Sequence, residues 1–219
     1  RSEVRNGLVE PAAYLLARGL LAVPMTVALC AVAIGVPGFG IGNWHAGDGR
    51  LLTTSLVWIA QQYCWDAYAT LCAVFFSHPL VGTAVYLFAW FNSFLYAGFI
   101  IPIYDVQWPM RVMCYVFPIR FSVRSLVWSD FADAEYDACD KYDAEDQFCY
   151  CGPDADKSVG CSGRDVLDQI SVVFRSISSK NTLLQDVGVI LGLAAVANVL
   201  ACCAFIRGAR GSPPPTLDA

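Results

Sequence analysis

Long runs of apolar residues dominate the chain and predict membrane-spanning helices. A bilayer core about 30 Å thick is crossed by roughly 20 apolar residues in helical conformation. Four runs of this length carry at most one charge, and their bounds are Gly19–Val36, Leu51–Phe76, Pro79–Ile103 and Val187–Ile206. We therefore predict four spans, with Ser77 and His78 forming a tight link between the second and the third.

The composition agrees with this interpretation of the runs. Hydrophobic residues make up 57% of the 219 residues and charged residues 15%, whereas a soluble domain carries about 25% charged residues. Core helices of a soluble protein would need more polar surface than this chain provides. A disordered chain or a nucleic-acid-binding protein would need more charge. We expect an all-α integral protein of a plasma or organelle membrane, surrounded by lipid and without a nucleic acid partner.

Positive charges indicate the orientation of the spans, because Lys and Arg favour the cytoplasmic side. They flank the first and last spans at Arg1, Arg5, Arg18, Arg207 and Arg210. We expect both chain ends in the cytoplasm and residues 104–186 outside. Because the chain begins at Arg1 and not at Met, we also expect a piece of a longer protein.

The outer region contains an acidic block with four cysteines. Residues 130–168 hold twelve of the nineteen acidic residues and three basic residues, a net charge of −9. The rest of the chain therefore has a net charge of +4, although the total for the chain is −5. On the oxidising side of a membrane we expect two disulfides rather than a zinc site. Three pairings are open among Cys139, Cys149, Cys151 and Cys161. A calcium loop is not expected, since the sixth residue from Asp137 is Tyr142 and not Gly.

Two stretches of the outer region have the pattern of short helices. Residues 106–131 are partly apolar, but their uninterrupted apolar run is too short to span a membrane. Trp108 and Trp128 favour helices that lie at the outer interface. Residues 164–174 predict an amphipathic helix. Its apolar residues at helical spacing are Val166, Leu167, Ile170 and Val173.

Motifs of enzymes are absent from the sequence. It contains no phosphate loop and no dinucleotide-binding glycine pattern, and His45 and His78 are isolated. We expect neither catalytic residues nor a metal site. Asp66 is the one charge deep in a predicted span, which makes it a functional candidate by default. A wet cavity or a neighbouring polar group would equally satisfy its carboxylate.

Two blocks of sequence resemble the membrane domain of the G subfamily of ABC transporters, the white-pigment and pleiotropic-drug-resistance type. The first, residues 1–24, is similar to the stretch before the third membrane helix of that subfamily. Its matching residues are Glu3, Gly7, Ala13, Tyr14, Leu16, Ala17, Arg18, Leu20 and Pro24, while Ser2 and Val9 depart from the pattern.

The second block, residues 97–131, is similar to the subfamily's stretch after the fifth helix. Its matching residues are Gly98, Phe99, Ile101, Val106, Tyr115, Pro118, Leu126, Asp130 and Phe131. Trp108 falls one position early, and Val112 and Phe121 replace a Trp and a Tyr. Residues 151–170, which precede the last span, also resemble the subfamily's cysteine loop and G-x-D-V-L segment.

The resemblance implies the last four of six helices of an ATP-driven export permease. Such a domain works as a dimer of halves, and a nucleotide-binding domain that this chain lacks binds ATP and Mg²⁺. Residues 1–18 would then be a cytoplasmic coupling segment, with Glu3 and Gly7 as coupling residues. No cofactor would bind to the chain itself.

The resemblance also implies where a lipophilic substrate would pass. The span that ends at Ile103 corresponds to the cavity-lining fifth helix, which makes Phe91, Asn92, Phe94 and Leu95 cavity candidates. Phe99 and Ile100 fall near the hydrophobic gate below the outer exit.

The expected organisation is residues 1–18 as the coupling segment, 19–103 as three spans, 104–186 as the outer region, 187–206 as the last span and 207–219 as a cytoplasmic tail. The alternative is a tetraspanin-like membrane organiser. It also has four spans and a cysteine-bearing loop before the last one, but its Cys-Cys-Gly hallmark is only approximated at residues 149–152, and it does not account for residues 97–131.

Overall fold

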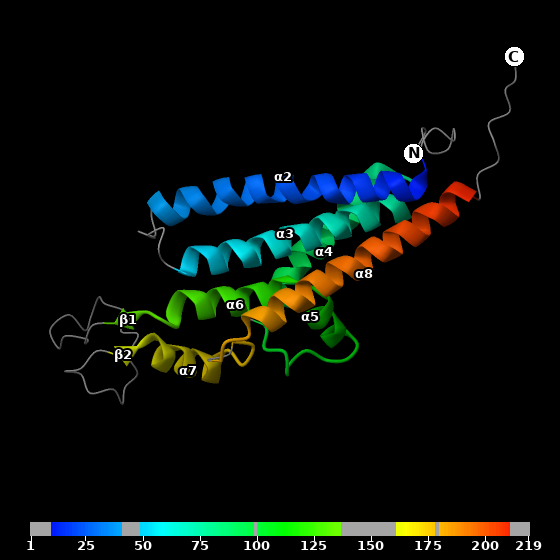
Figure 1. The fold of residues 1–219 in the computed structure, drawn as a ribbon. Coiled ribbons are helices and arrows are strands. Elements are labelled where there is room, and N and C mark those ends of the chain that lie inside the picture. Colours follow the sequence, from blue (N-terminus) through cyan, green and yellow to red (C-terminus); the bar gives the residue numbers. More distant parts are fainter. Residues whose placement is uncertain (1–9, 41–48, 99, 137–160, 178–179, 211–219) are drawn as a thin grey trace, which may run out of the picture. The chain divides into compact units, whose positions relative to one another are not determined.

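The computed structural model describes residues 10–40, 49–98, 100–136, 161–177 and 180–210. This part of the chain is mostly helical, as predicted (Figure 1). Its elements are α2 (Pro11–Gly40), α3 (Gly49–Phe75), α4 (Pro79–Leu95), the 3-10 helix η1 (Met110–Val112), α5 (Met113–Val116), α6 (Ile119–Phe131), β1 (Glu135–Tyr136), β2 (Cys161–Ser162), α7 (Gly163–Val173) and α8 (Leu183–Arg210). The chain divides into two compact units, and α3, α4 and α8 each continue from one unit into the other.

Two of the described helices are long and apolar enough to cross a membrane. The segments are Leu16–Val36 of α2 and Leu183–Arg207 of α8. Only 17% of the first segment's apolar window and 28% of the second's are buried within the chain. The core helix of a soluble protein would be mostly covered, so length, composition and exposure together suggest association with a membrane.

The second predicted span is found as the 27-residue helix α3, with bounds close to those expected. It has the length to cross a bilayer, but it is less apolar than α2 and α8. Arg50 and Asp66 lie within it, together with several Thr and Gln side chains. Four spans are therefore not established by the helices alone.

The third predicted span is shorter than expected. Helix α4 ends at Leu95 and not at Ile103, and its 17 residues measure about 25 Å. Gly98 follows with φ +80°, a left-handed conformation that stops a helix and that glycine adopts most readily. The Ser176 hydroxyl donates to the Gly98 carbonyl at 2.7 Å and holds this turn.

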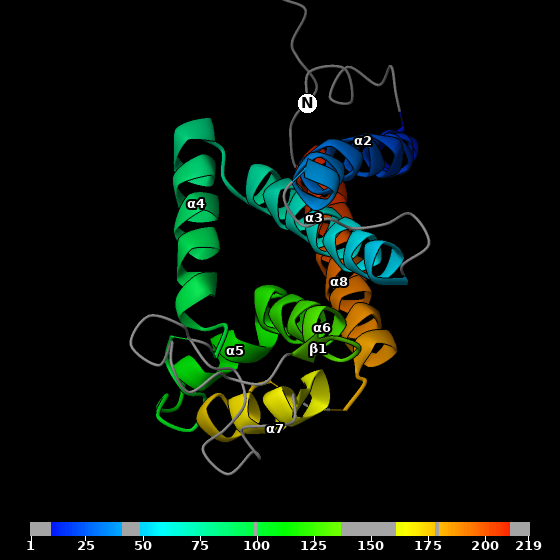
Figure 2. The ribbon, with the colours of Figure 1, turned by 90° about the vertical axis from the view of Figure 1, so that its left-hand side faces the viewer.

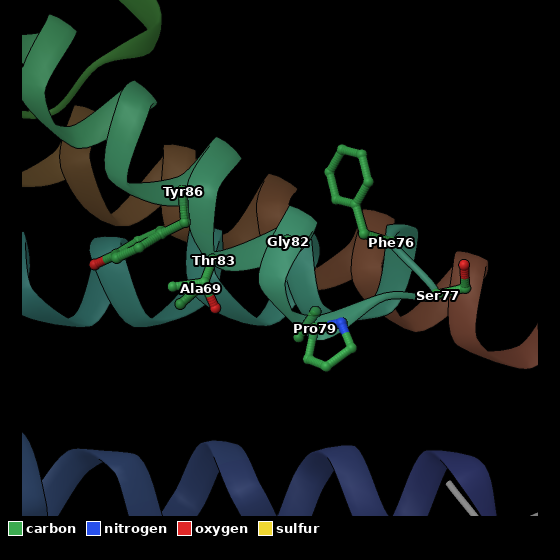
Figure 3. Close-up of a pocket in the computed structure, with 8 residues that line it drawn as sticks. Ala69, Phe76, Ser77, Pro79, Gly82, Thr83 and Tyr86 are labelled. Carbon is green, nitrogen blue, oxygen red and sulfur yellow. The ribbon is translucent and has the colours of Figure 1, made fainter.

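In the first unit, α3 and α4 form a tight hairpin. The link is Phe76–His78, and Pro79 opens α4 at the helix position that favours proline. A side chain at Gly82 would place its Cβ 3.3 Å from the Cys72 carbonyl oxygen, so this glycine permits close approach of the two helices. A cavity of about 330 Å³ lies beside this contact. Figure 3 shows side chains that line it, among them Thr83 and Tyr86 of α4.

The first unit also joins α2 to the end of α8. The rings of Tyr14, one turn into α2, and Phe205, one turn before the end of α8, stack with centroids 6.1 Å apart. The beginning of α2 and the end of α8 therefore lie beside one another. The side of a membrane on which the chain ends lie stays a prediction.

In the second unit, the short helices expected in residues 106–131 are present as η1, α5 and α6. A small core holds Ile103, Val106 and Cys114, with Tyr96 and Ile101 packed against it. Burial raises the pKa of the Cys114 thiol, which keeps it protonated and suits it to an apolar environment.

The amphipathic helix expected at residues 164–174 is confirmed as α7, which lies beside α6 (Figures 1 and 2). Ser162 caps it, because its hydroxyl accepts from the Asp165 backbone N–H while the Asp165 carboxylate accepts from the Ser162 N–H. Leu167 is fully buried against Ala132 and Ile177.

A short antiparallel pair of strands precedes α7. Glu135 of β1 pairs with Ser162 of β2, and Tyr136 pairs with Cys161. The pair brings together the chain on both sides of residues 137–160, which lie outside the described residues. Gly163 follows, and its N–H donates to the Ala134 carbonyl at 2.7 Å.

Replacing Gly163 by Ala tests this junction. An added Cβ would lie 1.5 Å from the Phe131 carbonyl oxygen, so backbone must move. We expect Gly163→Ala to lower the free energy of unfolding by roughly 3 kcal/mol, the upper range for overpacking. Gly35→Ala in α2 is the matched control, because nothing lies within 4 Å of its Cβ position. Thermal unfolding in detergent measures both; equal midpoints would contradict the close approach.

Candidate functional site

The first unit contains an ion pair between two helices. Arg18 of α2 and Asp66 of α3 approach with Nη2 3.8 Å from Oδ1. Arg18 thus pairs with the one acid deep in a predicted span. The side chains are 42% and 40% exposed, so the pair faces an open space rather than a packed core.

That space is a cavity of about 530 Å³ between α2, α3 and α8. Its walls are mostly aliphatic, and its apolar lining includes Leu16, Leu20, Val23, Leu191, Ala195 and Val199. Both members of the ion pair line it, together with Tyr63, Thr70 and Asn198. A largely apolar hollow with a few convergent polar groups is the usual form of a small-molecule site.

Hydrogen bonds within the helices hold some of these polar groups. The Thr70 hydroxyl donates to the Asp66 carbonyl at 2.8 Å, and the Asn198 amide donates to the Ala194 carbonyl at 3.0 Å. The Asn198 bond lies within α8 and does not link two helices. The side-chain charges of Arg18 and Asp66 are then the strongest polar features facing the cavity.

The predicted cavity residues on α4 lie elsewhere. Phe91, Asn92, Phe94 and Leu95 occupy its last turns, and the cavity between α2, α3 and α8 does not include them. Phe91 is 64% exposed and Phe94 41%. Ile100, the described member of the predicted gate, is 59% exposed in the turn after α4. Their roles in transport stay predictions.

Several predicted residues lie outside the described residues. These are Glu3, Gly7, Phe99, Cys139, Cys149 and Cys151. Cys161 is described in β2 and is not among the free thiols of the described chain. The pairing of the four loop cysteines stays a prediction. In the described residues, His, Cys, Asp and Glu side chains form no group of three that could hold a metal ion.

Gly188 and Gly192, four residues apart on α8, lie on one face of the helix. Cβ atoms built at Gly188 and Gly192 would meet nothing within 4 Å, and both glycines are exposed. This face of the helix is therefore uncovered by the described residues.

Sequence reasoning missed a second ion pair, between Arg124 of α6 and Asp186 in the first turn of α8. Arg124 donates to both carboxylate oxygens, and Asp186 is fully buried. The Ser125 and Thr182 hydroxyls each donate to Asp186 at 2.8 Å. The sequence shows an acid at the edge of a long apolar run and an arginine in a semi-apolar stretch, but neither segment indicates that the two form a pair.

Comparison with known proteins identifies no family for this chain. No protein-family model matches the chain, and no curated protein matches it.

The coupling between Arg18 and Asp66 tests whether the pair lies within a membrane. If the helices cross a bilayer, Arg18→Gln leaves a carboxylate without a partner in lipid, which costs about 2.5–3.5 kcal/mol. We expect Arg18→Gln to lower the melting temperature in lipid nanodiscs, and Asp66→Asn added to it to restore most of the loss. A double-mutant cycle measures this coupling. Coupling below about 1 kcal/mol, typical of exposed pairs in water, would contradict a membrane setting.

Proposed function

We propose that this chain is the permease part of an ATP-driven exporter of the ABC G-subfamily type, which moves lipophilic or lipid-like substrates across a membrane. The observation that carries the proposal is the largely apolar cavity of about 530 Å³ beside the long apolar helices α2 and α8. Ligand sites commonly measure about 300–1,000 Å³. An apolar molecule that carries one polar group would match these walls and the Arg18–Asp66 pair.

The chain would act with two partners. A nucleotide-binding domain would hydrolyse ATP with Mg²⁺, and a second transporter half would complete the path. The uncovered face at Gly188 and Gly192 supports a helix contact with a partner, since small residues let helix backbones approach in lipid.

Motion from the ATPase would enter through residues 1–10. This segment leads directly into α2, whose first turns stack on the end of α8 through Tyr14 and Phe205. A displacement of the beginning of α2 would therefore act on two of the three helices that line the cavity. That contact supports the role of Glu3 and Gly7 as coupling residues.

We further infer four spans and an outer cap braced by disulfides. The 27-residue length of α3 and its tight hairpin with α4 support two crossings in addition to α2 and α8. A polar helix such as α3 is tolerated in a membrane where its polar face lines a cavity. The strand pair at Tyr136 and Cys161 would anchor the cysteine-bearing loop.

Adjacent positions on α8 test the proposal. Ala195 lines the cavity, whereas Val196 is 58% exposed and does not line it. We expect Ala195→Trp to fill the cavity and lower kcat/KM for ATP-dependent export of a lipophilic dye about tenfold or more. We expect Val196→Trp to change it little. Dye efflux from vesicles containing the complete transporter, with its ATPase domain, measures both.

Equal losses in the two Trp variants would show that this cavity is not the substrate path. Wild-type vesicles that move no lipophilic substrate on addition of ATP would contradict the exporter proposal and favour a four-helix membrane organiser.

A further inference from the structure

The second unit contains a cavity of about 420 Å³ with a chemistry unlike that of the first. It lies between the first turns of α6 and the segment that leaves α7. Four of its lining side chains are cations, namely Arg120, Arg124, Arg175 and Lys180. The remaining lining is two serines and one aliphatic residue.

Among these cations, Arg120 has buried donor atoms without hydrogen-bond partners among the described residues. Its guanidinium lies over the Tyr115 ring at 4.9 Å and over the Phe121 ring at 5.7 Å. Its Nε and Nη1 are buried and have no hydrogen-bond partner among the described residues. Buried donors are nearly always satisfied, and a charged one is the costliest to leave unmade. The aromatic rings offset only part of this cost.

The neighbouring charged residues do not neutralise Arg120. Arg124 stands one turn along α6 from Arg120, where like charges repel, but its guanidinium is neutralised by Asp186. Neither Arg120 nor Arg175 has a carboxylate within ion-pair distance among the described residues. Arg175 instead lies over the Tyr104 ring at 5.5 Å.

The two serines do not compete with the arginines as donors. The Ser171 hydroxyl donates to the Asp168 carbonyl, and the Ser176 hydroxyl donates to the Gly98 carbonyl, both at 2.7 Å. Their protons are engaged with backbone carbonyls, so the donors that the cavity offers are chiefly those of the Arg120 and Arg175 guanidinium groups. A ligand that suits it must bring several acceptor oxygens and negative charge.

We propose that this cavity is a binding site for a phosphate-type oxyanion, held by Arg120 and Arg175. Arginine matches phosphate because its planar fork donates two parallel hydrogen bonds. The oxyanion is either inorganic phosphate from solution or the phosphate of a lipid headgroup. This site is independent of the exporter proposal, since it uses neither the cavity on α2, α3 and α8 nor ATP.

Calorimetric titration of the purified full chain in uncharged detergent tests the site. The probes are inorganic phosphate and short-chain phosphatidic acid, with short-chain phosphatidylcholine and chloride at equal ionic strength as references. We expect a phosphate-bearing probe to bind, with affinity about tenfold weaker in Arg120→Gln and in Arg175→Gln. Arg175 is exposed, so its variant reports binding even where loss of Arg120 disturbs folding.

Arg164→Gln is the matched control, because Arg164 lies on the exposed side of α7 and does not line the cavity. It should bind like the wild type. Binding of inorganic phosphate would identify a soluble ligand, and binding of phosphatidic acid alone would identify a headgroup.

Three results would overturn the proposal. The wild type could bind no phosphate-bearing probe, or Arg164→Gln could weaken binding as much as Arg175→Gln. Binding could also occur only after the acids of residues 137–160 are replaced by amides, which would identify the chain's own acidic segment as the occupant.

Discussion

The second unit depends on the burial of one carboxylate. Asp186 is fully buried, and an uncompensated charge in that position would cost several kcal/mol. Arg124, Ser125 and Thr182 all donate to it, so the carboxylate is hydrogen-bonded on both oxygens. The network fixes the first turn of α8 against α6, and the same helix continues into the first unit, where it lines the cavity.

The two cavities differ because of where charge is neutralised. In the first unit Arg18 and Asp66 balance each other among aliphatic walls, which suits a lipophilic ligand with one polar group. In the second unit Asp186 neutralises Arg124 alone, and Arg120 and Arg175 stay without a carboxylate among the described residues. An oxyanion would supply what this side lacks. The chain thus contains one largely apolar cavity and one cationic cavity, and the pairing of charges accounts for the difference between them.

Local pattern predicted most helices, and long-range contacts decided the rest. The length of the apolar runs predicted α2, α3 and α8, and the helical spacing of apolar residues predicted α7. Both signals come from residues that are close together in the sequence. The early end of α4 depends on Gly98 and its bond to Ser176, 78 residues away. Arg124 and Asp186 are 62 residues apart, so no local signal pairs them. Both cavities arise from packing, and the residues that line them could not be read from one segment.

Four spans and two spans differ in the side of the membrane on which the link between α3 and α4 lies. Four spans place Ser77 in the cytoplasm, whereas crossings by α2 and α8 alone place it outside with Gln107. The measurement is labelling of Ser77→Cys by a membrane-impermeant maleimide on intact and permeabilised cells, with the unsubstituted chain as baseline and Gln107→Cys as the outer reference. Four spans predict that Ser77→Cys is labelled only after permeabilisation. Labelling in intact cells equal to that of Gln107→Cys would contradict it.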